Sequence, residues 1–557
     1  MCRKRSIGSL LSASVSVAVS VLLLGVVACG DQDAARQTPT TESPEPAAST
    51  GPESVEEADA SPATTAAHEP EPEPQPVEPV DAASATSQAP ETSVPAEPDP
   101  QYNTASSEAA QDLEGRWEGA ISIPGPTDLP FAVELGASED GLRGTIDIQG
   151  FTGLPLSNLE LDEGGIHFEM QSPVGLAVWD GHVSDGVIEG EFTQVGMETT
   201  FWLQRFEDPA ALEGVAFHRE EVTFSNGEIV LAGDLTFPEG DGRHPAVVMI
   251  SGSGEQDRDS DFGGFRMFAV LADHLAGAGI ASLRFDDRGV GGSTGDNLQA
   301  ALHDRVGDVE AAVDLLHSHH DIDPGRVGLI GHSEGGIVAP LVANRSDGVA
   351  FVALLAAPAV SAEETLVAQQ RTLFEDSDST AEEIEQFRAS QELVFRAVAT
   401  GQGWDQAEAS MRALVWQQFE AFPEQMQEAI GDADAFVDGI VAEQMATWQS
   451  PWFESFFKHD PRPVIEELQV PVIALFGELD TQVPAADNAT AMSEAINESS
   501  VPGYTIATIF SANHQFQEAV TGSIEEYARL KREFAPDFVE ILTTWLTEVT
   551  GPEFDDD

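Results

Sequence analysis

Hydrophobic positions follow two different periods in the second half of this chain. Six short apolar runs occupy residues 245–250, 279–285, 327–330, 349–355, 470–476 and 504–510. Their length and β-branched content predict buried strands. Between or after them, residues 265–278, 305–317 and about 524–549 show the apolar spacing of helices. Strands that alternate with helices predict a mostly parallel sheet with helices on both faces, so we expect an α/β domain over residues 215–557.

Residues 111–208 show a different pattern, in which apolar and polar positions alternate and glycine or aspartate turns follow at short intervals. Strict alternation predicts half-buried strands, and seven or eight of them predict a small antiparallel barrel or sandwich. No group of polar residues in this segment suggests chemistry. We therefore expect a packing or substrate-guiding role for this β domain.

The chain begins with Arg3, Lys4 and Arg5, followed by small and apolar residues up to position 28. This pattern predicts a signal peptide over residues 1–28, since a basic start and a small-residue end mark an export signal. The ending Val-Val-Ala-Cys resembles a bacterial lipobox, which implies lipid attachment at Cys29; an ordinary secretory signal or an uncleaved anchor is the alternative. We expect an exported lipoprotein on the outer side of the cytoplasmic membrane or at the cell surface.

Residues 29–110 consist mainly of proline, alanine, glutamate, serine and threonine. Such a segment buries too little apolar surface to offset its ordering entropy, so we expect a disordered tether. The formal net charge of the whole chain is −72, with 97 acidic and 25 basic residues. This charge repels nucleic acid and excludes it as a partner. The sequence leaves the oligomeric state open.

One segment carries the strongest chemical signal. Ser333 lies in Gly-His-Ser-Glu-Gly-Gly, directly after the apolar run 327–330 and before a small-residue helix start. A strand, a glycine-flanked serine and a helix form the nucleophile elbow of serine hydrolases. A second match to the same pattern surrounds Ser293, but it follows a polar loop and opens no clear helix, so we interpret it as a turn.

The partners of a serine nucleophile follow in the required order, serine, acid, histidine. Asp480 follows the apolar run 470–476, and His514 follows the run 504–510. His514 would accept the Ser333 proton and Asp480 would orient its ring, with Glu478 as the nearest competitor for that role. Backbone N–H groups for the oxyanion are expected from Glu334 and from Ser253, with Gly254 as the alternative to Ser253.

Two further regions bear on function. Residues 361–467 are predicted to form a helical insertion at the position of a cap. The aromatic side chains of residues 451–457 could either line an acyl pocket or form the core of the cap. His317, His319 and His320 cluster near a helix C-terminus, where histidine is favoured by the helix dipole. Because no convergent carboxylate pair accompanies them in the sequence, we predict no metal, and since the motifs need no cofactor we predict none.

Taken together, the motifs at 251–259, 284–291, 331–336 and 477–480 and the His514 loop resemble bacterial α/β-hydrolases of the esterase and serine-aminopeptidase-like (S33-type) group. The resemblance implies an α/β-hydrolase fold with a helical cap and hydrolysis of esters of small or medium acyl groups. A peptide-like substrate is the alternative, since Glu363, Glu364, Glu382 and Glu383 of the cap could bind an amine. A non-enzymatic, ligand-binding surface lipoprotein is a second alternative.

Overall fold

The structure is a computed structural model that describes residues 113–551 except 123–128, 139–140, 149–150, 163–164, 173–174, 185, 195–196, 207–216, 241, 376–379, 423–426 and 429. The predictions for the signal peptide, Cys29 and the tether lie outside these described residues. Among the residues it describes, no helix is long and apolar enough to cross a membrane.

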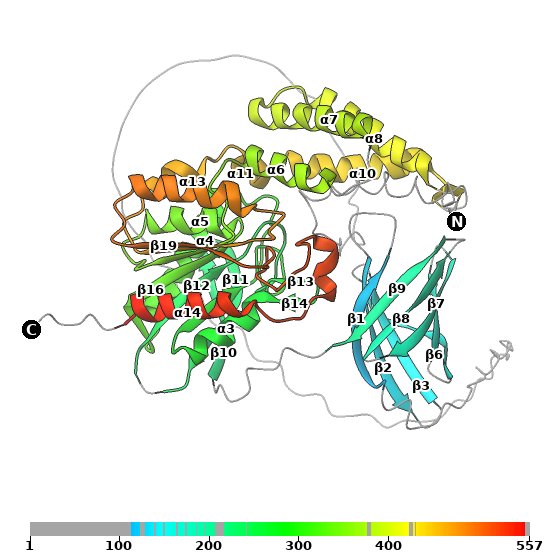
Figure 1. The fold of residues 1–557 in the computed structure, drawn as a ribbon, viewed down its shortest axis with the longest axis horizontal. Coiled ribbons are helices and arrows are strands. Elements are labelled where there is room, and N and C mark those ends of the chain that lie inside the picture. Colours follow the sequence, from blue (N-terminus) through cyan, green and yellow to red (C-terminus); the bar gives the residue numbers. More distant parts are fainter. Residues whose placement is uncertain are drawn as a thin grey trace, which may run out of the picture. The chain divides into compact units, whose positions relative to one another are not determined.

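The first sheet contains nine antiparallel strands in the order β4-β3-β2-β1-β9-β8-β7-β6-β5 (Figure 1). The strands are β1 Gly115–Ile121, β2 Leu129–Ser138, β3 Gly141–Ile148, β4 Phe151–Pro155, β5 Ser157–Asp162, β6 Gly165–Ser172, β7 Gly175–Ser184, β8 Val187–Gln194 and β9 Met197–Arg205. Strand β3 also contacts β5 from the other end of the sheet, which makes the sheet barrel-like. Its core includes Trp117, Phe168, Trp179 and Phe201, all at most 2% exposed. The predicted all-β unit is confirmed, with more strands than the seven or eight expected.

The second sheet has the order β10-β11-β15-β12-β16-β17-β18-β19. Its strands are β10 Phe217–Asn226, β11 Ile229–Pro238, β12 His244–Ile250, β15 Ala281–Phe285, β16 Ile322–His332, β17 Val352–Leu355, β18 Val472–Gly477 and β19 Tyr504–Ile509. The pairs β10–β11 and β11–β15 are antiparallel, and the pairs that join β15, β12, β16, β17, β18 and β19 are parallel. An antiparallel second strand and the exchanged third and fourth strands define the α/β-hydrolase topology, which confirms the predicted fold class.

Helices cover both faces of this sheet (Figure 1). On one face lie α4 (Leu302–Ser318), α5 (Gly335–Ala343) and α13 (Ala485–Glu498), which share one apolar core with the strands. On the other face lie α3 (Met267–Gly277) and α14 (Pro536–Val549). Apolar side chains therefore point from both faces of the central strands into the two cores, as continuous apolar runs require.

The prediction of one final helix over residues 524–549 was wrong. The structure has a short 3₁₀ helix, η2 (Ile524–Arg529), and then α14, which begins at Pro536. Proline lacks the N–H that a helix interior needs and forces the preceding residue into an extended conformation. Ala535 has ψ 133°, so the helix can start only at Pro536.

The insertion between β17 and β18 is helical. It contains α6 (Ala362–Glu375), α7 (Ala381–Thr400), α8 (Trp404–Ala421), α10 (Ala433–Trp448), α11 (Pro451–Phe457) and α12 (Pro461–Glu466). Thr380 and Glu383 form a capping box at the start of α7, and Gly401 ends that helix in the left-handed conformation. These helices bury a separate apolar core that includes Phe387, Phe395 and Trp448. The insertion is thus a packed cap.

Candidate active site

Ser333 occupies a sharp turn between β16 and α5. Its φ of 53° lies in the left-handed region, which costs a non-glycine residue about 1–2 kcal/mol. Glycines at 331 and 335 make the turn possible. A Cβ on Gly331 would lie 2.2 Å from the Gly335 carbonyl oxygen, and one on Gly335 would lie 2.2 Å from that of Ile250. The Ser333 N–H donates to the Leu355 carbonyl at 2.9 Å, which fixes the turn to β17.

Asp480 and His514 meet at the ends of β18 and β19. His514 Nδ1 lies 2.8 Å from Asp480 Oδ2, and both residues are 5% exposed. The other oxygen of Asp480 accepts the backbone N–H groups of Gln482 and Val483, each at 2.8 Å. An acceptor at Nδ1 places the ring proton there, so Nε2 keeps the lone pair that a general base needs. Glu478 is exposed and accepts the Ser511 N–H instead, so it is Asp480 that reaches His514.

His332 connects the elbow to the His514 loop. Its Nε2 donates to the His514 carbonyl oxygen at 3.0 Å, and the two rings lie 4.7 Å apart. Burial, together with the neighbouring His514, lowers the pKa of His332 to about 3, so the ring is neutral. Since His332 directly precedes Ser333, this bond holds His514 beside the elbow. Sequence reasoning missed this residue, although its position next to the serine was visible.

The loop expected to supply the second oxyanion donor lies against the elbow. A Cβ on Gly252 would lie 3.1 Å from the Ser333 Cβ and 3.6 Å from its hydroxyl oxygen, so the two backbones approach closely. Ser253 is exposed and Gly254 half-buried, with a positive φ of 92°. Ser333 is also half-buried. The structure therefore brings the loop and the elbow together at the carboxyl end of the sheet.

Asp287 binds both ends of the loop segment 251–256 through hydrogen bonds. It accepts the Ser251 hydroxyl at 2.8 Å and the Gln256 N–H at 3.1 Å. Asn297 donates to the Gly254 carbonyl at 2.9 Å and to Asp287 at 3.3 Å. Burial raises the pKa of Asp287 to about 6. In addition to these hydrogen bonds, a group of ion pairs anchors the other end of the loop.

These ion pairs join Arg258 to Asp286 and Asp234. The guanidinium lies 2.7 Å from Asp286 Oδ2 and 2.5 Å from Asp234 Oδ1. Although burial raises the pKa of Asp286, the bonds from Arg258 and from backbone N–H groups hold it below its usual range. Residues 251–258 are thus fixed at both ends, which preorganises any donor they carry.

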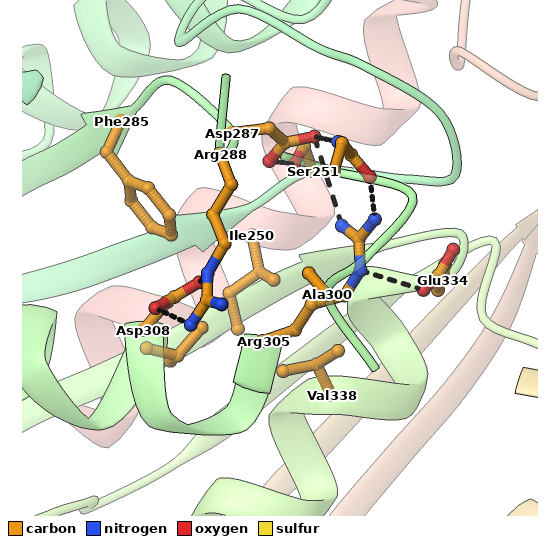
Figure 2. A pocket seen from close by; sticks show the side chains of 12 residues that line it. Ile250, Ser251, Phe285, Asp287, Arg288, Ala300, Arg305, Asp308, Glu334 and Val338 are labelled. Carbon is orange, nitrogen blue, oxygen red and sulfur yellow. Dashed lines mark hydrogen bonds and ion pairs between the residues drawn. The ribbon is translucent and has the colours of Figure 1, made fainter. Parts of the chain in front are cut away.

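The carboxylate of Glu334 points inward, although this residue directly follows Ser333. It is 2% exposed and accepts the Trp452 indole N–H at 2.9 and 3.0 Å. Arg305 Nε lies 3.5 Å from the same carboxylate (Figure 2). Removing one partner of a buried charge costs about 3–5 kcal/mol, so these contacts matter for the elbow. The pocket of Figure 2 is lined by Glu334, Arg305, Asp287 and Ser251 but, among the described residues, by neither Ser333 nor His514.

Three other predicted features have clear positions. Ser293, the second serine in a matching pattern, is buried; its hydroxyl donates to the Asp286 carbonyl and accepts the Ala232 N–H in a turn. Of the predicted histidine cluster, His319 and His320 place their ligand atoms within 4.8 Å of each other and of Asp321, whereas His317 Nε2 donates to the Gly348 carbonyl oxygen at 3.0 Å. His319, His320 and Asp321 directly precede β16, whereas Ser333 directly follows it, so they lie at the opposite end of this strand from Ser333. The aromatic side chains Trp452, Phe453 and Phe457 are packed in the cap core.

The topology and the elbow define an α/β-hydrolase, and comparisons with known proteins agree with this class. The family described as serine aminopeptidase, S33, matches residues 262–399. Esterase EstD of Thermotoga maritima is 27% identical over 305 residues, which are 54% of this chain and 60% of EstD. The chain thus spans under two thirds of that relative's length. These similarities support a hydrolase.

Two further matches are more limited. An uncharacterized protein of Mycobacterium tuberculosis is 34% identical over 107 residues, which are 19% of this chain and 34% of that protein. The solved structure of the Pyrococcus furiosus esterase Pf2001 has a TM-score of 0.36 and 13% identity, covering 62% of this chain and 95% of that one.

Proposed function

We propose that this chain is a serine hydrolase that cleaves carboxylic esters of small to medium acyl groups through an acyl-enzyme on Ser333. The observation that carries the proposal is the buried Asp480–His514 hydrogen bond of 2.8 Å. The His514 loop is joined to the elbow through the bond from His332 Nε2 to the His514 carbonyl oxygen, and Ser333 in that elbow has a strained φ of 53°. Strain of this kind persists only where the surrounding structure imposes it, and it concentrates at functional sites.

The reaction would run in two acyl transfers. The Ser333 oxygen attacks the ester carbonyl while its proton moves to His514 Nε2, and Asp480 stabilises the resulting imidazolium. The tetrahedral intermediate then expels the alcohol, which takes the proton from His514. A water molecule attacks the acyl-enzyme by the same route and releases the acid. The N–H groups of Glu334 and of Ser253, or of Gly254 in its place, would hold the oxyanion.

Labelling and turnover test this proposal. A fluorophosphonate probe should label Ser333, and Ser333→Ala should lower p-nitrophenyl ester turnover by at least ~10³-fold with the fold intact. Ser293→Ala is the matched control, because it removes the serine of the second Gly-x-Ser-x-Gly match and should leave turnover within a few-fold. A non-enzymatic lipoprotein would neither bind the probe nor hydrolyse esters of any acyl length. A series of acyl lengths would define the preferred substrate.

A serine aminopeptidase or amidase with the same catalytic residues is the second candidate, and the S33 family match favours it. Such an enzyme needs a free carboxylate for the substrate amine. Glu364 and Glu383 instead accept bonds from Ser361 and Thr380 at the starts of cap helices. Glu334 is bound to the cap, whereas Glu363 and Glu382 are exposed, so an amine site of the cap would have to use one of these two carboxylates. Faster turnover of aminoacyl anilides than of matched esters would favour this second candidate.

We also propose that Cys29 carries a lipid that anchors the enzyme at the outer face of the cytoplasmic membrane or at the cell surface. The support is the sequence of residues 1–29 alone. Cys29→Ser should release an active enzyme from the membrane fraction. Continued membrane association of that variant would contradict the lipid anchor and favour an uncleaved signal segment.

A further inference from the structure

The backbone and the side chain of Glu334 have separate roles. Its backbone N–H is the expected oxyanion donor, while its side chain is buried and leads away from the site. A carboxylate in such a place must be paired, because an unpaired buried charge is strongly unfavourable. The groups that pair it therefore also restrict the peptide that carries the N–H.

The principal partner comes from the cap. Trp452, on α11, directs its indole N–H at both carboxylate oxygens, at 2.9 and 3.0 Å. The indole is 3% exposed, and its own backbone N–H donates to the Leu298 carbonyl at 3.1 Å. Ser450 caps α11 by accepting the Phe453 N–H. Helix α11 thus holds the indole in one orientation against the elbow.

The second partner extends the same network to the other oxyanion donor. Arg305 lies 3.5 Å from the Glu334 carboxylate, with its guanidinium 5.9 Å from the centre of the Trp452 ring. It also donates to Asn297 and lies 4.0 Å from Asp287 (Figure 2). Asn297 and Asp287 are the residues that fix the loop containing Ser253 and Gly254. One set of buried contacts therefore joins the cap, the elbow and the oxyanion loop.

We propose that Trp452 is a positioning residue through which the docked cap aligns the oxyanion hole. This inference rests on the proposed hydrolase function. Substrate binds to the site without this alignment, whereas the transition state requires both N–H groups to point at the developing oxyanion. Loss of the indole N–H should consequently lower kcat and leave KM nearly unchanged.

The test compares two tryptophans of the cap. Trp452→Phe removes the bond to Glu334 and keeps an aromatic ring; we expect kcat to fall by about 10–100-fold with KM within about twofold. Trp448→Phe is the matched control, because its buried indole N–H has no hydrogen-bond partner within the described chain. A boronic acid that forms a tetrahedral adduct with Ser333 should lose affinity by the same factor as kcat. Binding of the carboxylic acid product should not change.

A double-mutant cycle separates positioning from a general loss of packing. Trp452→Phe should have a much smaller effect in a Glu334→Gln background, because the buried charge that the indole holds is already gone. If Trp452→Phe does not fold, Glu334→Gln alone must lower kcat at constant KM. Wild-type kcat in Trp452→Phe, an equal loss in Trp448→Phe or additive effects in the cycle would overturn the proposal. Failure of the proposed function is distinct, because wild type itself would then neither label nor turn over.

Discussion

Gly335→Ala should separate the nucleophile elbow from the oxyanion loop. The added Cβ would lie 2.2 Å from the Ile250 carbonyl oxygen and 2.6 Å from that of Ser251. Cβ atoms essentially never approach other atoms within 3.0 Å, so α5 and the loop must move apart by about 0.8 Å. Both obstacles are backbone atoms of the strand and loop that would carry the proposed second oxyanion donor, so neither can rotate away as a side chain would.

The size of the effect follows from this displacement. A misplacement of about 1 Å in an active site costs up to about 10²-fold in rate, or ~2.7 kcal/mol of transition-state stabilisation. Overpacking should lower the free energy of unfolding by about 1–3 kcal/mol. The higher helix propensity of alanine offsets up to ~1 kcal/mol of that loss at the start of α5. We therefore expect a large fall in kcat and a moderate fall in stability.

The assay measures kcat and KM on a p-nitrophenyl ester together with denaturant unfolding. Gly439→Ala is the control, because this exposed glycine lies inside α10 and its Cβ would meet no atom within 4 Å. That variant should gain about 0.5–1 kcal/mol of stability and keep wild-type kcat. A Gly335→Ala enzyme with kcat within twofold of wild type and unchanged stability would refute the reasoning.

Three other predictions concern single side chains. Asp480→Asn should lower kcat by about 10⁴-fold with the fold intact, whereas Glu478→Gln should not; equal losses, measured by ester turnover, would contradict the assignment. Relative to Asp287→Asn, wild-type stability should fall by up to ~3 kcal/mol as pH rises from about 4 to 6, because the unfolded carboxyl ionises near 3.8 and the folded one near 6. Relative to His332→Gln, wild-type stability should fall by ~1.4 kcal/mol per pH unit below 6.5, because burial holds the folded pKa near 3 and only the unfolded ring gains a proton. Parallel unfolding curves for wild type and variant across either pH range would contradict the corresponding pKa shift.

Some features of the site could be predicted because they are local. A buried strand, a glycine-flanked turn and a helix start lie within about fifteen residues of Ser333, and backbone geometry alone restricts such a segment. Asp480 and His514 were predicted in the same way, each as the polar end of an apolar run. The final helix shows the limit of this reasoning. Its apolar spacing continues across Pro536, a residue that a helix accepts at its start but not in its interior.

The sequence by itself determined the α/β and all-β units, the elbow, and the order of serine, acid and histidine, because period and turn chemistry act over neighbouring residues. Only the tertiary structure decided that Asp480, and not Glu478, reaches His514. It alone showed that Glu334 is held by an indole 118 positions further along the chain. Such contacts depend on how helices and loops from distant segments pack together, and a linear pattern of hydrophobic and polar residues does not record which side chains then face each other.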